Sequence, residues 1–193
     1  MPHVDLAFRL MGTKLPVDHG YALFSAINRL LPGLHDAKAV GVHPIRGRYN
    51  SDGTLIVMPF SHLIFRLPDD GLPPYLTLTG KDLDVDGYSL HVGAPEVRRL
   101  RPTAVLFARL VTIKGFMEPG AFLEAAKRQL QEMEVTADLQ VGQRRTFRVK
   151  DKQVVGFEVI AAQLSAEDSV QLQEIGIGGR RRMGCGVFVP LRA

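Results

Sequence analysis

Apolar and polar residues recur along the first half of the chain with the periods of strands and helices. Strict alternation over residues 4–10 predicts a half-buried strand. An apolar stripe with helical spacing predicts a helix that starts near Asp18, a plausible N-cap, and ends near Leu34 after loosening at Pro32-Gly33. The other elements predicted in this half are strands at residues 39–46, 55–67 (interrupted at Pro59) and 88–92, and a short helix at residues 73–80.

The same order of elements begins again after residues 94–102. A near-continuous apolar run predicts a buried strand at residues 105–113, and Pro119 opens a helix whose inner stripe reaches Met133. The remaining predicted elements are strands at 136–141, 146–149 and 154–162, a helix from a capping box at Ser165 to Ile175, and a last strand at 187–189. Two successive βαββαβ units indicate an α+β chain of tandem ferredoxin-like (RRM-like) domains, residues 1–97 and 98–193.

Composition narrows the class of protein. With 193 residues, 46% of them hydrophobic, the chain has enough apolar side chains for one or two globular cores. The single cysteine, Cys185, excludes a disulfide framework and a cysteine-rich zinc site, and it indicates a reducing compartment such as the cytoplasm. The first residues show no pattern of a signal peptide, and no apolar stretch reaches the ~18 residues that a membrane helix needs.

A glycine-rich loop near the C-terminus carries the most informative charge pattern. The triplets Gly176-Ile177-Gly178 and Gly184-Cys185-Gly186 flank five residues, which include Gly179 and the run Arg180-Arg181-Arg182. Residues 176–193 hold four arginines, Arg192 included, and no acid, so they account for the whole net charge of +4. Glycine lets backbone N–H groups approach an anion closely, and arginine forks suit phosphate. We therefore expect a phosphate-bearing partner, most simply a nucleic acid, although a solvated turn would show similar residues.

The spacing of the two triplets resembles the C-terminal signature of the RAMP superfamily of CRISPR-associated proteins. Within it, the chain resembles the Cas-six family of endoribonucleases, which cut precursor CRISPR RNA. A second match lies near the start, where Leu15-Pro16-Val17-Asp18-His19-Gly20-Tyr21 opens the first helix and Leu34-His35-Asp36 follows it. In that family the catalytic histidine commonly sits just after the first helix. The resemblance also implies tandem ferredoxin-like domains, in agreement with the order of elements.

Cleavage of RNA at its own 2′-hydroxyl needs a base, an acid and a cation near the phosphorane, and a histidine of near-neutral pKa suits the first two roles. The resemblance makes His35 the first candidate; His43, close to Arg46 and Arg48, is the second. Arg46, or an arginine of the glycine loop, would stabilise the charge. His19 is expected to shape the start of the helix. The sequence shows no carboxylate pair or histidine cluster at metal-ligand spacing, so we expect neither a metal nor another cofactor.

The predicted partner is CRISPR repeat RNA and its processed product, with other subunits of an effector complex as further partners. A hairpin arm bearing Arg144 and Arg145 is expected to enter the groove of a repeat stem-loop. The other predicted RNA-binding residues are those of the glycine loop, namely Gly176, Gly178, Gly179, Arg180, Arg181, Arg182, Gly184 and Gly186. Two alternatives remain open at this point: a non-catalytic RAMP subunit that only holds guide RNA, and a ferredoxin-like RNA-binding protein unrelated to CRISPR.

Overall fold

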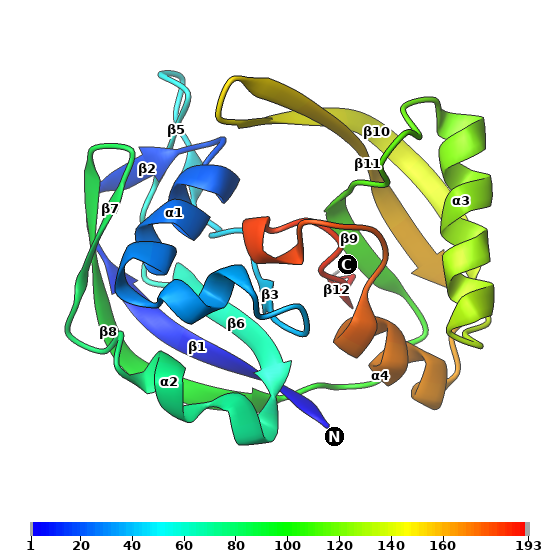
Figure 1. Ribbon diagram of the computed structural model, residues 1–193, viewed down its shortest axis with the longest axis horizontal. Helices are drawn as coiled ribbons and strands as arrows, with labels where there is room; N and C mark the ends of the chain where they lie inside the picture. Colours follow the sequence, from blue (N-terminus) through cyan, green and yellow to red (C-terminus); the bar gives the residue numbers. More distant parts are fainter. Residues whose placement is uncertain (1, 192–193) are drawn as a thin grey trace. The chain divides into compact units, whose positions relative to one another are not determined.

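The computed structural model describes residues 2–191, so Arg192 lies outside the described residues. The chain divides into two compact units, Met1–Arg99 and Leu100–Ala193. Each unit has its own antiparallel sheet and its own helices (Figure 1). Among the described residues, no helix is both long enough and apolar enough to span a membrane.

The first unit is built on a five-stranded sheet in the order β3-β6-β1-β8-β7, with all neighbours antiparallel. The strands of this sheet are β1 (His3–Met11), β3 (Gly41–Val42), β6 (His62–Pro68), β7 (Asp82–Val85) and β8 (Tyr88–Arg99). The helical elements of the unit are α1 (Gly20–Leu30), η1 (Pro32–His35), η2 (Asp69–Gly71) and α2 (Pro73–Leu76). Without the added edge strand β7, this is the strand order of one ferredoxin-like βαββαβ unit.

Alternation along β1 buries one face of this sheet. The core side chains of β1 are Val4, Leu6, Phe8 and Leu10. Against the sheet, α1 buries the stripe that contains Phe24 and Ile27, and the Arg29 guanidinium on α1 donates to the Asp84 carbonyl on β7 over 2.7 Å. Figure 1 shows α1 beside β7. The first helix is shorter than predicted because its α-helical hydrogen bonds stop at Leu31, after which residues 32–35 form a separate 3-10 turn.

Two of the predicted strands of the first unit were wrong in detail. Residues 55–67 do not form one interrupted strand, because β5 (Thr54–Ile56) leaves the main sheet and pairs with β2 (Lys14–Pro16) and β4 (Arg48–Tyr49) in a small three-stranded sheet. The strand predicted at residues 39–46 is only two residues long as β3. The strand β7 was not predicted, because its short alternation follows a turn directly.

The second unit has a four-stranded sheet in the order β10-β11-β9-β12. Its elements are β9 (Leu106–Val111), α3 (Pro119–Glu132), β10 (Asp138–Val149), β11 (Lys152–Ala162), α4 (Ala166–Ile175), η3 (Arg181–Met183) and β12 (Val189–Pro190). The two strands predicted at 136–149 are one strand, β10, with an irregular register between Val141 and Arg144. On α3, which lies along β10 in Figure 1, Phe122 packs against Phe157 of β11 with ring centroids 4.8 Å apart.

The predicted capping box at the start of α4 is confirmed for its N-cap, Ser165, whereas the Asp168 carboxylate accepts the Ser165 hydroxyl instead of the Ser165 amide. The Ser165 hydroxyl accepts a hydrogen bond from the Asp168 amide over 3.0 Å and donates to the Asp168 carboxylate over 2.8 Å. The order β9-α3-β10-β11-α4-β12 and the sheet order are those of a second ferredoxin-like unit. The predicted α+β class with tandem ferredoxin-like folds is therefore confirmed.

Replacing Ser165 by Ala should lower the free energy of unfolding by about 1 kcal/mol, because the Asp168 amide loses its acceptor at the helix N-terminus. Urea unfolding followed by circular dichroism measures this change. The matched control is Ser89→Ala, an exposed serine on β8, which should change the free energy by less than about 0.5 kcal/mol. Equal effects of the two substitutions would contradict the capping role.

Candidate functional site

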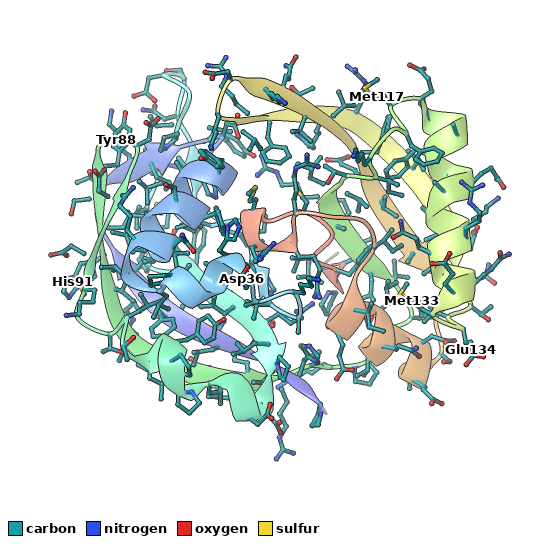
Figure 2. All side chains as sticks on the ribbon, in the orientation of Figure 1. Asp36, Tyr88, His91, Met117, Met133 and Glu134 are labelled. Atoms are coloured by element: carbon teal, nitrogen blue, oxygen red, sulfur yellow. The ribbon has the colours of Figure 1, made fainter. Side chains whose placement is uncertain are left out.

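His35, the first candidate for proton transfer, is exposed at the end of η1, the turn that follows the first helix. The turn is held by the buried Leu34 and by the Asp36 amide, which donates to the carbonyls of Gly33 and Leu34. The His35 ring lies 6.3 Å from the Phe24 ring, tilted by 43°. Figure 2 labels the adjacent Asp36 at the end of this turn. His35 therefore combines a fixed backbone with a solvent-accessible imidazole.

His43, the second candidate, is buried in a network of charged side chains. Its Nε2 lies 3.3 Å from Oδ1 of Asp5, and its backbone N–H donates to the Ile64 carbonyl over 2.9 Å. The same carboxylate accepts two hydrogen bonds from the Arg66 guanidinium, at 2.8 Å and 2.9 Å. Arg66 is only 1% exposed, so this bidentate ion pair lies in the interior. The network joins β1, β6 and the segment after β3.

The electrostatics of this network keep Asp5 ionised. Burial alone would raise the pKa of the Asp5 carboxyl, but hydrogen bonds from His43 and Arg66, with the charges of the two groups, hold that pKa well below its ordinary value. A buried ion pair of this kind is costly to break, because removing one partner leaves an uncompensated charge. The arrangement gives His43 a positioned, buried partner rather than open access to solvent.

Two further histidines, His19 and His91, are hydrogen-bonded within the first unit. The buried His19 bridges Pro16 and Ile45: its Nδ1 lies 2.9 Å from the Pro16 carbonyl oxygen, and its Nε2 accepts the Ile45 amide over 3.0 Å. These bonds assign the proton to Nδ1. The expectation that His19 shapes the start of α1 is confirmed. His91, labelled in Figure 2, lies on β8 with Nδ1 2.8 Å from the Asp82 carboxylate.

Arg46 directly follows Ile45, the residue whose amide donates to His19 Nε2. Its side chain is exposed, while its carbonyl accepts the Ser61 hydroxyl over 2.6 Å. The backbone is thus fixed and the guanidinium faces solvent. This exposure leaves Arg46 able to meet an anionic ligand, as its predicted role requires.

The glycines of the C-terminal loop fold against the protein itself. Gly176, Gly178, Gly184 and Gly186 all have positive φ. A Cβ atom at Gly178 would collide with the Thr112 carbonyl oxygen, and one at Gly176 would collide with the Gly186 carbonyl oxygen. The close approach that the glycines permit is therefore made to neighbouring backbone.

The loop amides also donate within the protein. The amides of Gly178 and Gly179 donate to Gln129 Oε1 over 2.7 Å and to the Thr112 carbonyl over 2.9 Å. At the other end of the loop, the Gly186 amide donates to the Leu110 carbonyl over 2.8 Å. The glycine pattern predicts that such amides face an anion, whereas these three serve as structural donors. These three amides are therefore not available to an anion, which leaves the arginine side chains among the donors of the loop that could meet one.

The three loop arginines differ in their surroundings. Arg180 is exposed and has a left-handed backbone, with φ +61°. Arg181 and Arg182 are half-buried in η3, and a Cβ at Gly176 would lie 3.1 Å from the Nε of Arg181. The glycine therefore leaves room for a guanidinium beside it, and Arg180 is the arginine most open to a ligand.

The two arginines of the predicted arm also differ. Both lie on β10, where Arg144 is exposed. Arg145 is paired with Glu158 of β11: its Nε donates to Glu158 Oε1 over 2.8 Å, and its Nη2 contacts the same oxygen. Arg144 thus offers a charge to solvent, while that of Arg145 is largely compensated.

Within residues 2–191, no group of three or more His, Cys, Asp or Glu side chains is arranged to hold a metal ion. Four residues that hold candidate site residues in place were not identified from the sequence. They are Asp5 and Arg66 in the first unit, and Thr112 and Gln129 in the second. The alternation of β1 and β6 does place Asp5 and Arg66 opposite the apolar face, which was a usable signal. Nothing in the local sequence marks Gln129 as the acceptor for a loop 49 residues away.

Comparison with known proteins places the chain in a family. The family model described as Cas6 Crispr matches residues 4–193. The CRISPR-associated endonuclease Cas6 of Myxococcus xanthus (strain DK1622) is 44% identical over 190 residues, which cover 98% of this chain and 82% of that protein.

Two solved structures share the fold at low sequence identity. A CRISPR-associated protein Cas6 superposes with a TM-score of 0.71 at 13% identity, covering 98% of this chain and 100% of the other. A RAMP protein described as binding different RNA substrates superposes with a TM-score of 0.69 at 15% identity, covering 96% and 98%. With the family match over nearly its whole length and the 44% identical relative, the chain belongs to the Cas6 family of CRISPR-associated proteins.

Proposed function

We propose that this protein is an endoribonuclease that cuts CRISPR repeat RNA in the cytoplasm and binds the repeat and the processed product. The observation that carries the proposal is an exposed histidine, His35, on a fixed turn in a chain 44% identical to a Cas6 endonuclease. The first unit would supply the catalytic histidine, and the second the RNA-binding loop.

The chemistry we propose needs no metal. A base removes the proton of the 2′-hydroxyl, the 2′-oxygen bonds to phosphorus, and the bond from phosphorus to the 5′-oxygen breaks. An acid protonates the departing 5′-oxygen, which leaves a 2′,3′-cyclic phosphate and a 5′-hydroxyl. His35 serves as base or acid, because an exposed imidazole has access both to the RNA and to solvent protons. Arg46, or an arginine of the loop, stabilises the charge of the phosphorane.

His43 is the second candidate for this role. Its burial and its contact with Asp5 favour a structural function, since its Nε2 already faces a carboxylate. Because the His43 ring is buried and the His35 ring is exposed, His35 is preferred as the catalytic histidine.

RNA binding is proposed to use the arginines rather than the glycines. Arg180 and Arg144 present exposed guanidinium groups, and the backbone of the glycine loop holds Arg181 and Arg182 next to Arg180. Phosphate contacts of this kind fix the register of a nucleic acid without reading its bases. Arg145 contributes less in this proposal, because Glu158 compensates its charge.

The alternative is a non-catalytic RAMP subunit that holds guide RNA in an effector complex. The RAMP protein described as binding different RNA substrates shares the fold, and this fold is compatible with RNA binding without cleavage. The two functions differ in whether a poised histidine is required.

Replacing His35 by Ala should lower the single-turnover cleavage rate by about 10²- to 10⁴-fold, the usual effect of losing a general acid–base group. Affinity for repeat RNA should change little, because the loop arginines are untouched. His91→Ala, which removes a histidine paired with Asp82 on β8, is the control and should keep the full rate. A slower His43→Ala variant would transfer the role to His43; full activity of both would favour the non-catalytic subunit.

Cleavage should proceed equally fast in EDTA and in magnesium, as measured by gel electrophoresis of labelled repeat RNA. A 2′-deoxy nucleotide on the 5′ side of the cut should stop cleavage and leave binding intact, because the attacking oxygen is gone. A rate that collapses in EDTA would exclude the metal-free route. Cleavage of the deoxy substrate would show that water attacks instead.

Changing Arg180, Arg181 and Arg182 together to Gln should weaken binding to all RNA sequences and make its dependence on salt shallower. The slope should fall by roughly 0.7 for each single-stranded phosphate that the variant no longer neutralises. Filter binding over a series of salt concentrations measures both quantities. The control Lys81→Gln with Lys127→Gln removes two exposed charges outside the loop and should leave the slope unchanged. Unaltered binding of the triple variant would move the RNA site elsewhere.

A further inference from the structure

The residues just before Arg180 are fastened by two elements distant in sequence. The Gly178 amide donates to the Gln129 side chain on α3, over 2.7 Å. The Gly179 amide donates to the Thr112 carbonyl just after β9, over 2.9 Å, and the Thr112 hydroxyl donates back to the Gly179 carbonyl over 3.2 Å. Thr112 is 2% exposed, so this anchor is rigidly packed.

The C-terminal end of the loop is hydrogen-bonded to β9 as well. The Gly186 amide donates to the Leu110 carbonyl, two residues before Thr112. Between these two anchored ends of the loop, the Arg180 carbonyl accepts hydrogen bonds from the amides of Met183 and Cys185, at 2.8 Å and 3.3 Å. The arginine run therefore lies in a closed loop whose base is set by β9.

Among the acceptors of the loop amides, Gln129 differs from Leu110 and Thr112 because its accepting oxygen belongs to a side chain. The Leu110 and Thr112 carbonyls belong to the backbone, and no substitution removes them. Gln129 is half-buried on α3, and its Oε1 is the acceptor for the Gly178 amide. Removing that oxygen leaves the amide of a positive-φ glycine without its partner, which favours other conformations of the loop.

We propose that Gln129 is a positioning residue for RNA binding: it holds Gly178, and through it Arg180, in the conformation that meets phosphate. This inference rests on the proposed role of the loop arginines in binding RNA. A loop ordered before binding does not lose that conformational freedom when RNA docks, so its affinity is higher. Gln129 is not one of the groups proposed to transfer protons, so its effect is expected on binding, and on cleavage only if a loop arginine rather than Arg46 stabilises the phosphorane.

The test compares Gln129→Met, which keeps the length of the side chain and removes the acceptor, with Gln129→Glu, which keeps an acceptor oxygen. The controls are Gln131→Met and Gln131→Glu, changes at an exposed position of the same helix that match the loss of amide and the added charge. Three quantities are measured: hydrogen exchange of the Gly178 amide by NMR, affinity for a non-cleavable 2′-deoxy repeat RNA, and the single-turnover rate at saturating RNA.

Gln129→Met should speed exchange at Gly178 and weaken RNA affinity by about 3- to 10-fold, the range expected for removing one hydrogen bond, relative to Gln131→Met. With Arg46 as the cation at the phosphorane, the saturated rate should remain within about twofold; a larger fall would assign that role to a loop arginine that Gln129 positions. Gln129→Glu should restore slow exchange and bind RNA as well as Gln131→Glu does. This rescue by an acceptor separates positioning from a general loss of packing.

Three results would overturn the inference, and each has a different meaning. If Gln129→Met binds RNA normally while the triple arginine variant does not, the RNA site stands and the positioning role of Gln129 is wrong. If the triple arginine variant also binds normally, the loop does not hold RNA and both proposals fall. Loss of affinity in Gln129→Met that Gln129→Glu does not rescue would likewise reduce Gln129 to a packing residue.

Discussion

The close packing of the two glycine triplets against each other and against the end of β9 is the constraint on which the loop of the second unit depends. β9 is an inner strand that pairs with β11 and β12, and the carbonyls at and just beyond its end accept the loop amides. Positive φ at the glycines and the lack of a Cβ allow backbone to lie against backbone. Uncharged backbone groups thereby hold the segment that carries the three arginines.

In the first unit, the main constraint is instead a group of buried charged side chains. Asp5 and Arg66 form a bidentate pair on the sheet, with His43 beside them. Such a pair is weak evidence for stability, because desolvation opposes its Coulombic attraction. Its geometric effect is clearer: it fixes the segment after β3 against β1 and β6. Two histidines close in sequence thus have opposite surroundings, one buried against a carboxylate and one exposed on a turn.

The sequence allowed the fold to be predicted where a signal was local. Alternation in β1, the stripe of α3 and the Ser165 N-cap each depend on residues within a few positions, and the structure confirms them. The small sheet of β2, β4 and β5 could not be predicted, because pairing between short strands depends on tertiary contacts. The glycine spacing was visible, but its physical use was not, since the partners of the amides come from β9 and α3.

The closed loop on β9 separates two kinds of change during evolution. Gly176, Gly178 and Gly186 cannot gain side chains without collision, whereas exposed Arg180 can be exchanged while its backbone stays anchored on either side. Charge, size and hydrogen-bonding groups at the tip can therefore vary while the scaffold beneath them remains the same. Neighbouring residues of this loop therefore differ in their tolerance of substitution: packing fixes Gly176, Gly178 and Gly186, whereas the side chain of Arg180 lies outside that packing.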